Sequence, residues 1–170
     1  MLFSLIYILL IIAANILASL WIIPLPFGLA VPAGVICFAP IFTLRDRIQI
    51  DRGAKWIYSL ILIAALLSWL TGLASGSSLL SKISIAGLIA FVLSESLDTI
   101  IFTLIRRSFV IRALASNLVS AGLDSALFIW IAFGWNTGTV IGLWLVKIII
   151  AALVIPILKP KSEKIKIPVV

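Results

Sequence analysis

Six apolar segments, each long enough to cross a lipid bilayer, account for most of this 170-residue chain. A membrane-spanning helix needs about 20 predominantly apolar residues. Only 11% of the residues are charged, against about 25% in an ordinary soluble domain, so polar side chains are too few to cover a water-soluble core. The sequence therefore predicts an all-α, polytopic integral membrane protein with six transmembrane helices over residues 1–158 and a basic tail over 159–170. The predicted spans are 2–22, 27–44, 56–75, 83–105, 113–133 and 138–158.

The connections between the predicted spans alternate between many and few basic residues. Four lie in 45–55, three in 106–112 and four in the tail, whereas the connections on the other side hold only Lys82. Cytoplasmic loops carry an excess of Lys and Arg, so we expect both termini in the cytoplasm and the protein in the cytoplasmic (inner) membrane. This orientation accounts for the net charge of +7 without a nucleic-acid partner. The first segment lacks the basic start of a signal peptide, so we expect it to be retained.

The second apolar segment is interrupted by Pro32, Gly34 and Pro40. Proline removes a backbone donor and frees a carbonyl that lipid cannot satisfy. Two interpretations follow: a broken or re-entrant segment that faces a cavity, and a kinked but continuous helix.

Composition also limits the chemistry available to the chain. Histidine is absent and Cys37 is the one cysteine, whereas zinc, haem and iron–sulfur sites and histidine acid–base catalysis need these residues. We therefore expect no metal, no cofactor and a function other than that of an enzyme.

Four ionisable residues fall inside predicted spans: Glu95, Asp98, Asp124 and Lys147. An Asp or Lys at a helix centre costs about 2.5–3.5 kcal/mol on insertion scales, so these side chains should face the bundle interior or a wet cavity. Three acids against one internal base leave at least one acid in need of a proton, a cationic ligand or a hydrogen-bond donor. The alternative is that Lys147 only locks the helices together through Asp124 or Glu95.

Helical spacing predicts that these residues share one cavity. Glu95, Asp98 and Phe102 form one stripe, and a second stripe follows the fifth span. Glu95, Asp124 and Lys147 lie about 15–17 Å from the cytoplasmic ends of their spans, at a similar depth. The second stripe consists of Ser116, Ser120, Asp124 and Phe128, Asn15 lies within about a turn of that depth, and Trp69, Trp130 and Trp144 are candidate aromatic walls. The alternative for the two serines is that they only permit close helix packing.

In these residues the chain resembles the VUT family of six-helix vitamin uptake transporters, which includes the bacterial queuosine precursor transporters. Where many members have a second loop acid, this chain has Ile50, followed by Asp51. The similar pieces are Asn15, the segment 38–46, Asp98 with Phe102, the segment 116–120 with Asp124, the segment 131–133, and Lys147 with Pro156.

This resemblance implies uptake of a 7-deazaguanine base, the 7-cyano or 7-aminomethyl precursor of queuosine. It places Asn15, Asp46, Asp98, Ser116, Asp124 and Lys147 among the positions that matter. The chemistry agrees, because one carboxylate can accept both the ring N–H and the exocyclic amine of a guanine-like base.

The interpretation of the binding site assigns one task to each group. Asp124 or Glu95 holds the base edge, Asp98 or its partner neutralises a cationic substituent, and Lys147 balances the empty site. An aromatic residue, Trp130 or Phe128, stacks on the ring.

Arg45 and Asp46, with Arg47, fall in the predicted cytoplasmic connection. A gating ion pair is one interpretation, and a solvated loop cluster that follows the positive-inside rule is the other. Arg106, Arg107, Arg112 and the lysine tail are interpreted as orientation and headgroup contacts.

Three alternatives to a self-contained transporter remain. The chain has no phosphate-binding P-loop, so the energy for transport must come from a gradient, from metabolic trapping or from a separate energising partner. The first alternative is therefore that the chain is the substrate-binding subunit of a larger importer. It could also be a membrane enzyme that acts on lipid headgroups with a metal held by Glu95, Asp98 and Asp124. A structural or pore-forming bundle is the third, and the sequence leaves open whether the chain forms a homo-oligomer.

Overall fold

Six helices and one short hairpin make up the described part of the chain, residues 2–26, 30–74 and 76–160 of a computed structural model. The predicted all-α class and the six-helix count are confirmed for these residues. Most of the predicted basic tail, with Lys161, Lys164 and Lys166, lies outside the described residues. The elements are α1 (Leu2–Leu20), β1 (Ile22–Pro24), β2 (Ala30–Pro32), α2 (Val35–Arg52), α3 (Ala54–Ala74), α4 (Ser78–Leu104), α5 (Phe109–Phe133) and α6 (Thr137–Leu158).

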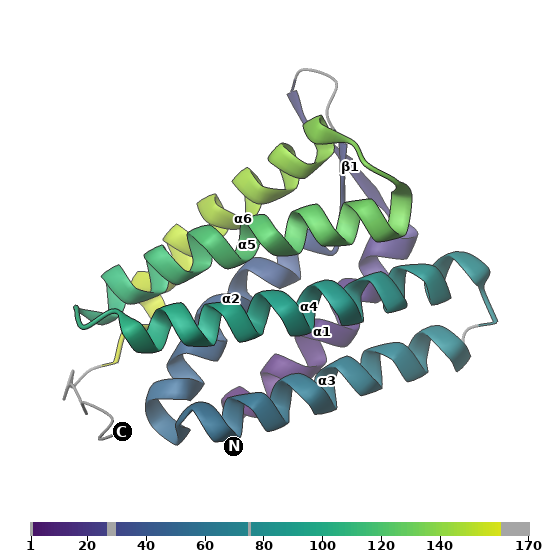
Figure 1. Cartoon of the computed structure of the whole chain (residues 1–170). Coiled ribbons are helices and arrows are strands. Elements are labelled where there is room, and N and C mark those ends of the chain that lie inside the picture. Colours follow the sequence, from purple (N-terminus) through teal and green to yellow (C-terminus); the bar gives the residue numbers. More distant parts are fainter. Residues whose placement is uncertain (1, 27–29, 75, 161–170) are drawn as a thin grey trace.

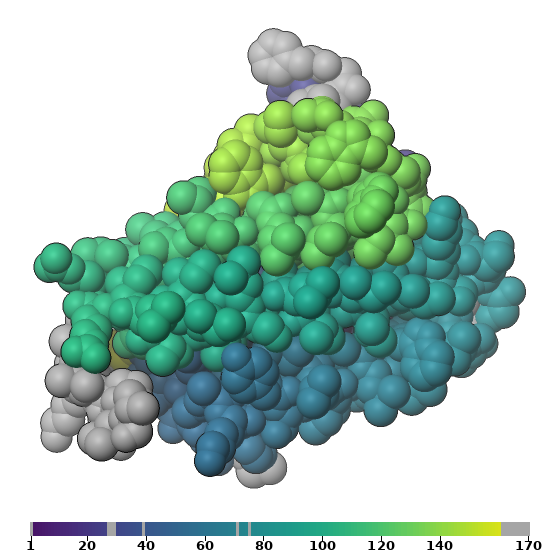
Figure 2. Space-filling view, in the orientation of Figure 1, coloured from purple at the N-terminus to yellow at the C-terminus, as the bar shows by residue number. Residues whose placement is uncertain are grey.

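Among the described residues, five helices are long and apolar enough to cross a membrane: α1, α3, α4, α5 and α6. The helices expose large apolar side chains, such as Leu66, Leu93 and Leu153, which a lipid environment accommodates. The face of the molecule in Figure 2 is formed by α3, α4, α5 and α6, from the bottom of the view to the top. The protein is therefore a multi-pass membrane protein.

The helices alternate in direction, so the start of α1 and the end of α6 lie toward the same end of the bundle (Figure 1). The connection from α2 to α3, which Arg52 and Lys55 flank, and the connection from α4 to α5, which contains Arg106 and Arg107, are at that end too. The hairpin and the turn from α5 to α6 lie at the opposite end. The positive-inside rule predicts that this basic end faces the cytoplasm.

The second apolar segment is broken, as one of the two sequence interpretations predicted. Residues 30–32 form β2, which pairs with β1 in antiparallel register, with Ile22 opposite Pro32. Helix α2 begins only at Val35 and then continues through Pro40. A Cβ at Gly34 would collide with the backbone carbonyl of Ala14, so the close approach of this break to α1 requires glycine.

The predicted connection over residues 45–55 was wrong. Helix α2 continues to Arg52, and only Gly53, with a φ of 89°, separates it from α3. Two features keep this polar stretch helical. The buried face of α2 finds polar partners inside the bundle, and Arg47 forms an i, i+4 ion pair with Asp51 at 3.2 Å on the outside.

Candidate functional site

Six charged side chains are buried within the described residues, and they form two groups. The first is the Asp124–Lys147 pair, which joins α5 to α6. The second, the Arg45 cluster, consists of Arg45, Asp46, Glu95 and Asp98 and joins α2 to α4. A buried charge is tolerated in a low-dielectric interior only when it is paired or neutralised, so the partners of each group decide whether its charge is balanced.

The Asp124–Lys147 pair connects four helices. The Lys147 ammonium donates to Asp124 Oδ2, and the Ser94 hydroxyl of α4 donates to Asp124 Oδ1 at 3.3 Å. Lys147 Nζ also lies 5.3 Å from the ring centroid of Phe38 and 5.9 Å from that of Phe42, both on α2. These distances are within the range of cation–π attraction. One ammonium group therefore ties α2, α5 and α6 together.

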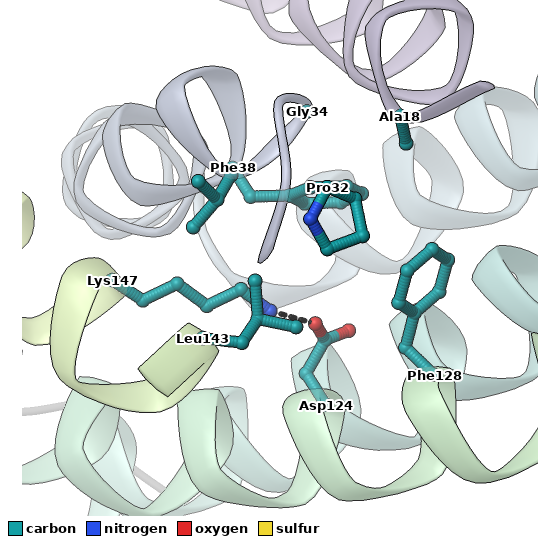
Figure 3. A pocket seen from close by; sticks show the side chains of 9 residues that line it. Ala18, Pro32, Gly34, Phe38, Asp124, Phe128, Leu143 and Lys147 are labelled. Atoms are coloured by element: carbon teal, nitrogen blue, oxygen red, sulfur yellow. Dashed lines mark hydrogen bonds and ion pairs between the residues drawn. The ribbon is translucent and has the colours of Figure 1, made fainter. Parts of the chain in front are cut away.

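A pocket opens beside this pair, and Figure 3 shows Lys147 and Asp124 meeting in its wall. The broken segment supplies Pro32 and Gly34 to the lining, which agrees with the interpretation that it faces a cavity. The cavity volume is about 10 Å³, close to the room that one water molecule needs. A purine-sized molecule does not fit until helices move apart. The lining residues are Ala18, Pro32, Gly34, Val35, Phe38, Asp124, Phe128, Leu143 and Lys147.

The Arg45 guanidinium is the centre of the second group. Its Nη2 pairs with Asp46 Oδ1 at 3.1 Å and with Asp98 Oδ2, and its Nε pairs with Glu95 Oε2 at 3.0 Å. All four side chains are fully buried. The fork-shaped guanidinium suits such multiple pairing, since it offers five donors in a fixed plane.

Neutral polar groups complete the surroundings of Arg45. Its Nη1 donates to Gln49 Oε1 at 2.7 Å and to Thr99 Oγ1 at 3.3 Å. From α1, the Tyr7 hydroxyl donates to Glu95 Oε2 at 3.4 Å. Helix α1 therefore also contacts the Arg45 cluster.

The solvated-loop interpretation of Arg45 and Asp46 was wrong, because both side chains are 0% exposed. Glu95 and Asp98 do meet a base, as predicted for buried acids, but the base is Arg45 rather than Lys147. The predicted count of three internal acids against one internal base therefore becomes four against two.

Several predicted residues occupy other places around the two groups. Phe128 lines the pocket, as proposed for a stacking residue. Ser116 and Ser120 are fully buried on α5. Asn15 is buried too, but it donates to Ser68 and lines a second, smaller pocket next to Phe91.

The prediction that Trp130 forms an aromatic wall was wrong. Its side chain is 60% exposed on the outside of α5, whereas Phe128, two residues earlier, points inward. Two residues along a helix correspond to about 200° of rotation, so the two rings cannot share one face.

Two buried residues differ from the sequence-based expectation: Arg45, which was predicted in a connection as part of a gating pair or a solvated cluster, and Asn117, which was not in the predicted site. Arg45 continues the buried face of α2 from Phe38 and Phe42 at intervals of four and three residues, and this periodicity was the available signal. Asn117 is only 1% exposed, and both polar atoms of its side chain lack a hydrogen-bond partner among the described residues. Its spacing of three and seven residues from Ser120 and Asp124 places it on the same stripe.

Comparison with known proteins gives one match. Residues 32–159 match the model of a family described as putative vitamin uptake transporter. The matched region runs from β2 to the end of α6 and contains all six buried charges. No curated protein and no solved structure matches the chain.

Proposed function

Because the chain belongs to the family of putative vitamin uptake transporters, we propose that it imports a purine-like queuosine precursor across the cytoplasmic membrane. The substrate would be 7-cyano-7-deazaguanine or 7-aminomethyl-7-deazaguanine, carried without chemical change. Its base edge would be held by Asp124 in the pocket between α1, β2, α2, α5 and α6. The observation that carries this proposal is a buried carboxylate in the wall of the pocket, paired with the Lys147 ammonium group.

Asp124 has the chemistry that a guanine-like edge requires. A carboxylate accepts the ring N–H and the exocyclic amine side by side, a pairing that is strong in a dry site. The base would take the place of Lys147 at Oδ2, while the Ser94 hydroxyl keeps Oδ1 oriented. Asp124 would then have a donor in both the empty and the loaded state.

Aromatic side chains next to the pair support a planar ligand. Phe38 and Phe128 both line the pocket, and they lie on α2 and α5. When the helices separate, a flat base can enter between these two rings. Phe38 already lies near the Lys147 ammonium, so it can hold that cation after the base has displaced it.

The test is the queuosine content of tRNA in a bacterial strain that lacks both precursor synthesis and its native transporter. The strain expresses this chain and is fed nanomolar 7-deazaguanine precursor. We expect the chain to restore queuosine and Asp124→Asn to abolish it at equal protein level. Asp51→Asn is the matched control, because Asp51 is an acid on the outside of α2 with a side chain that is 38% exposed.

Two results would count against this proposal. If the chain reaches the membrane and no queuosine appears, the substrate assignment is wrong for the chain acting alone. Copurification of an ATPase from the native host would then favour the role of a substrate-binding subunit in a larger importer. If Asp124→Asn restores queuosine as well as the unaltered chain does, the base is held elsewhere.

A further inference from the structure

The Arg45 cluster carries more negative charge than its guanidinium can balance. Asp46, Glu95 and Asp98 are fully buried around one arginine, so the ionised cluster has a net charge of −2, whereas the Asp124–Lys147 pair is neutral. A further cation, half-buried Arg112 on α5, is close enough to Asp46 to act on it electrostatically. Even with Arg112 counted, one carboxylate has no countercharge.

Bare oxygen atoms show where this excess charge lies. Each acid pairs with Arg45 through one of its two carboxylate oxygens. The second oxygen has no hydrogen-bond partner among the described residues; these atoms are Asp46 Oδ2, Glu95 Oε1 and Asp98 Oδ1. An unpaired carboxylate away from water is costly, and the usual relief is uptake of a proton. A protonated carboxyl would also gain a donor.

An acceptor for such a donor is present on the neighbouring helix. Ser120 is fully buried, and its hydroxyl has no partner among the described residues. Helices α4 and α5 run antiparallel and are in register at the Ser94–Asp124 hydrogen bond. One helical turn further along both, Asp98 and Ser120 come to the same level. An unused hydroxyl therefore lies at the depth of the Arg45 cluster.

We propose that the Arg45 cluster is a proton-binding site and that proton entry through it drives uptake; the coupling rests on the transport function proposed above. A proton from the outer side adds to a bare oxygen of Glu95 or Asp98, forms an O–H bond and removes one negative charge. It leaves to water on the cytoplasmic side. A metal cation is a poorer fit, because it needs several oxygens around itself, and the guanidinium occupies the point where the three acids converge.

Helices α2 and α4, which hold the proton site, also contact the substrate pocket or its carboxylate. Helix α2 carries Arg45 and, two turns earlier, Phe38 of the pocket lining. Helix α4 carries Glu95 and, next to it, Ser94, which holds Asp124. Protonation of Glu95 or Asp98 weakens the ion pairs that tie α2 to α4. This frees α2 to move and to enlarge a pocket that is closed while those pairs are intact.

Charged and titratable groups from every neighbouring helix bear on this equilibrium. Helix α1 contributes Tyr7, α5 contributes Arg112 and Asp124, and α6 contributes Lys147 through its pair with Asp124. The titratable residues of α3, Lys55 and Tyr58, are exposed. Lys147 and Asp124 cancel each other in the empty state, so the Arg45 cluster is where a proton changes the net charge of the interior.

The first test needs no substrate. Infrared spectra of the reconstituted protein are recorded during a pH titration that stays above about pH 5, where exposed carboxyl groups remain ionised. The C=O stretching band of protonated carboxyl groups is followed, and its shift in heavy water confirms the assignment. We expect a titrating band in the unaltered chain and in Asp51→Asn, a weaker band in Glu95→Gln or Asp98→Asn, and its loss in the double variant. The amide bands of the same spectra report whether each variant is folded. Absence of the band from the unaltered chain overturns the proposal.

The second test measures coupling in proteoliposomes with the membrane potential clamped at zero and labelled 7-cyano-7-deazaguanine as probe. An inside-alkaline gradient of one pH unit supports about tenfold accumulation per proton, since a factor of ten equals about 1.4 kcal/mol. We expect about tenfold accumulation for the unaltered chain and for Asp51→Asn, and a ratio near one for the double variant. Accumulation driven by a sodium gradient, with no response to pH, overturns the proposal. If the carboxyl band titrates but no base enters, the proton site stands and the substrate assignment fails.

Discussion

Replacement of Lys147 by methionine removes the cation from the buried pair and keeps much of the side-chain volume. The Lys147 and Asp124 side chains are only 2% and 4% exposed. Removing one partner of such a pair costs about 3–5 kcal/mol, because the other charge stays buried without compensation. The Phe38 and Phe42 rings, 5.3 and 5.9 Å from the ammonium, add a cation–π loss of about 0.5–2 kcal/mol. We therefore expect Lys147→Met to lower the free energy of unfolding by at least about 3 kcal/mol.

The double variant Asp124→Asn with Lys147→Met separates pairing from packing. A neutral amide keeps an acceptor for the Ser94 hydroxyl and leaves no buried charge, so we expect the double variant to recover most of the loss. The coupling energy from the double-mutant cycle should reach about 2 kcal/mol or more. Reversible unfolding in mixed detergent micelles, followed by circular dichroism, measures all four proteins. The matched control is the exposed Arg47–Asp51 pair, for which we expect a coupling below about 1 kcal/mol.

The reasoning is refuted if the costs of Lys147→Met and Asp124→Asn simply add. That result would mean that the two side chains do not interact in the folded protein, and Lys147 would not be the partner of Asp124 that the base replaces. A large coupling energy at the control pair would show that the assay responds to surface charge rather than to burial.

Three further predictions concern other parts of the bundle. Arg45→Gln leaves three buried acids without their cation and should lower the free energy of unfolding by more than about 3 kcal/mol. The control Arg47→Gln should lower it by less than about 1 kcal/mol, and melting temperatures in detergent compare the two variants. Gly87→Leu should separate α1 from α4, because even a Cβ at Gly87 would lie 3.1 Å from Asn15 Oδ1, and a loss of thermal stability with retained membrane insertion checks this. Trp130→Ala should leave both the unfolding midpoint and tRNA queuosine unchanged, because the ring is 60% exposed; a loss of queuosine would restore Trp130 as a ligand.

The helices could be located from hydropathy because lipid enforces a simple rule. Each span needs enough apolar residues to cross the bilayer, and the predicted start and end of the first, fifth and sixth spans fall within a few residues of the observed helix ends, as with 138–158 against Thr137–Leu158. The burial of Glu95, Asp98, Asp124 and Lys147 followed from the same rule and is confirmed.

Hydropathy does not predict the burial of a polar residue when its partners lie far away in the sequence. Arg45 looked like part of a cytoplasmic loop because charged residues surround it in the sequence. The acids that make its burial tolerable, Glu95 and Asp98, lie about fifty residues away on α4. No local pattern records such a pairing. Only the continuation of the buried face of α2 beyond Leu44 pointed to it.

The two buried charge groups differ in how they are neutralised, and this difference suits two tasks in the proposed cycle. Asp124 has Lys147 when the pocket is empty and would have the base edge when it is loaded, so it keeps a partner throughout. Asp124 is therefore never left as an unpaired buried charge while the substrate binds and leaves, a state that would cost several kcal/mol. The three acids of the Arg45 cluster outnumber Arg45 and the nearby Arg112, and a small donor or a proton can satisfy their spare oxygens. Asp124, which exchanges one donor for another, can therefore select a ligand, whereas the Arg45 cluster, which has more acids than cations, can bind a proton and use the proton gradient.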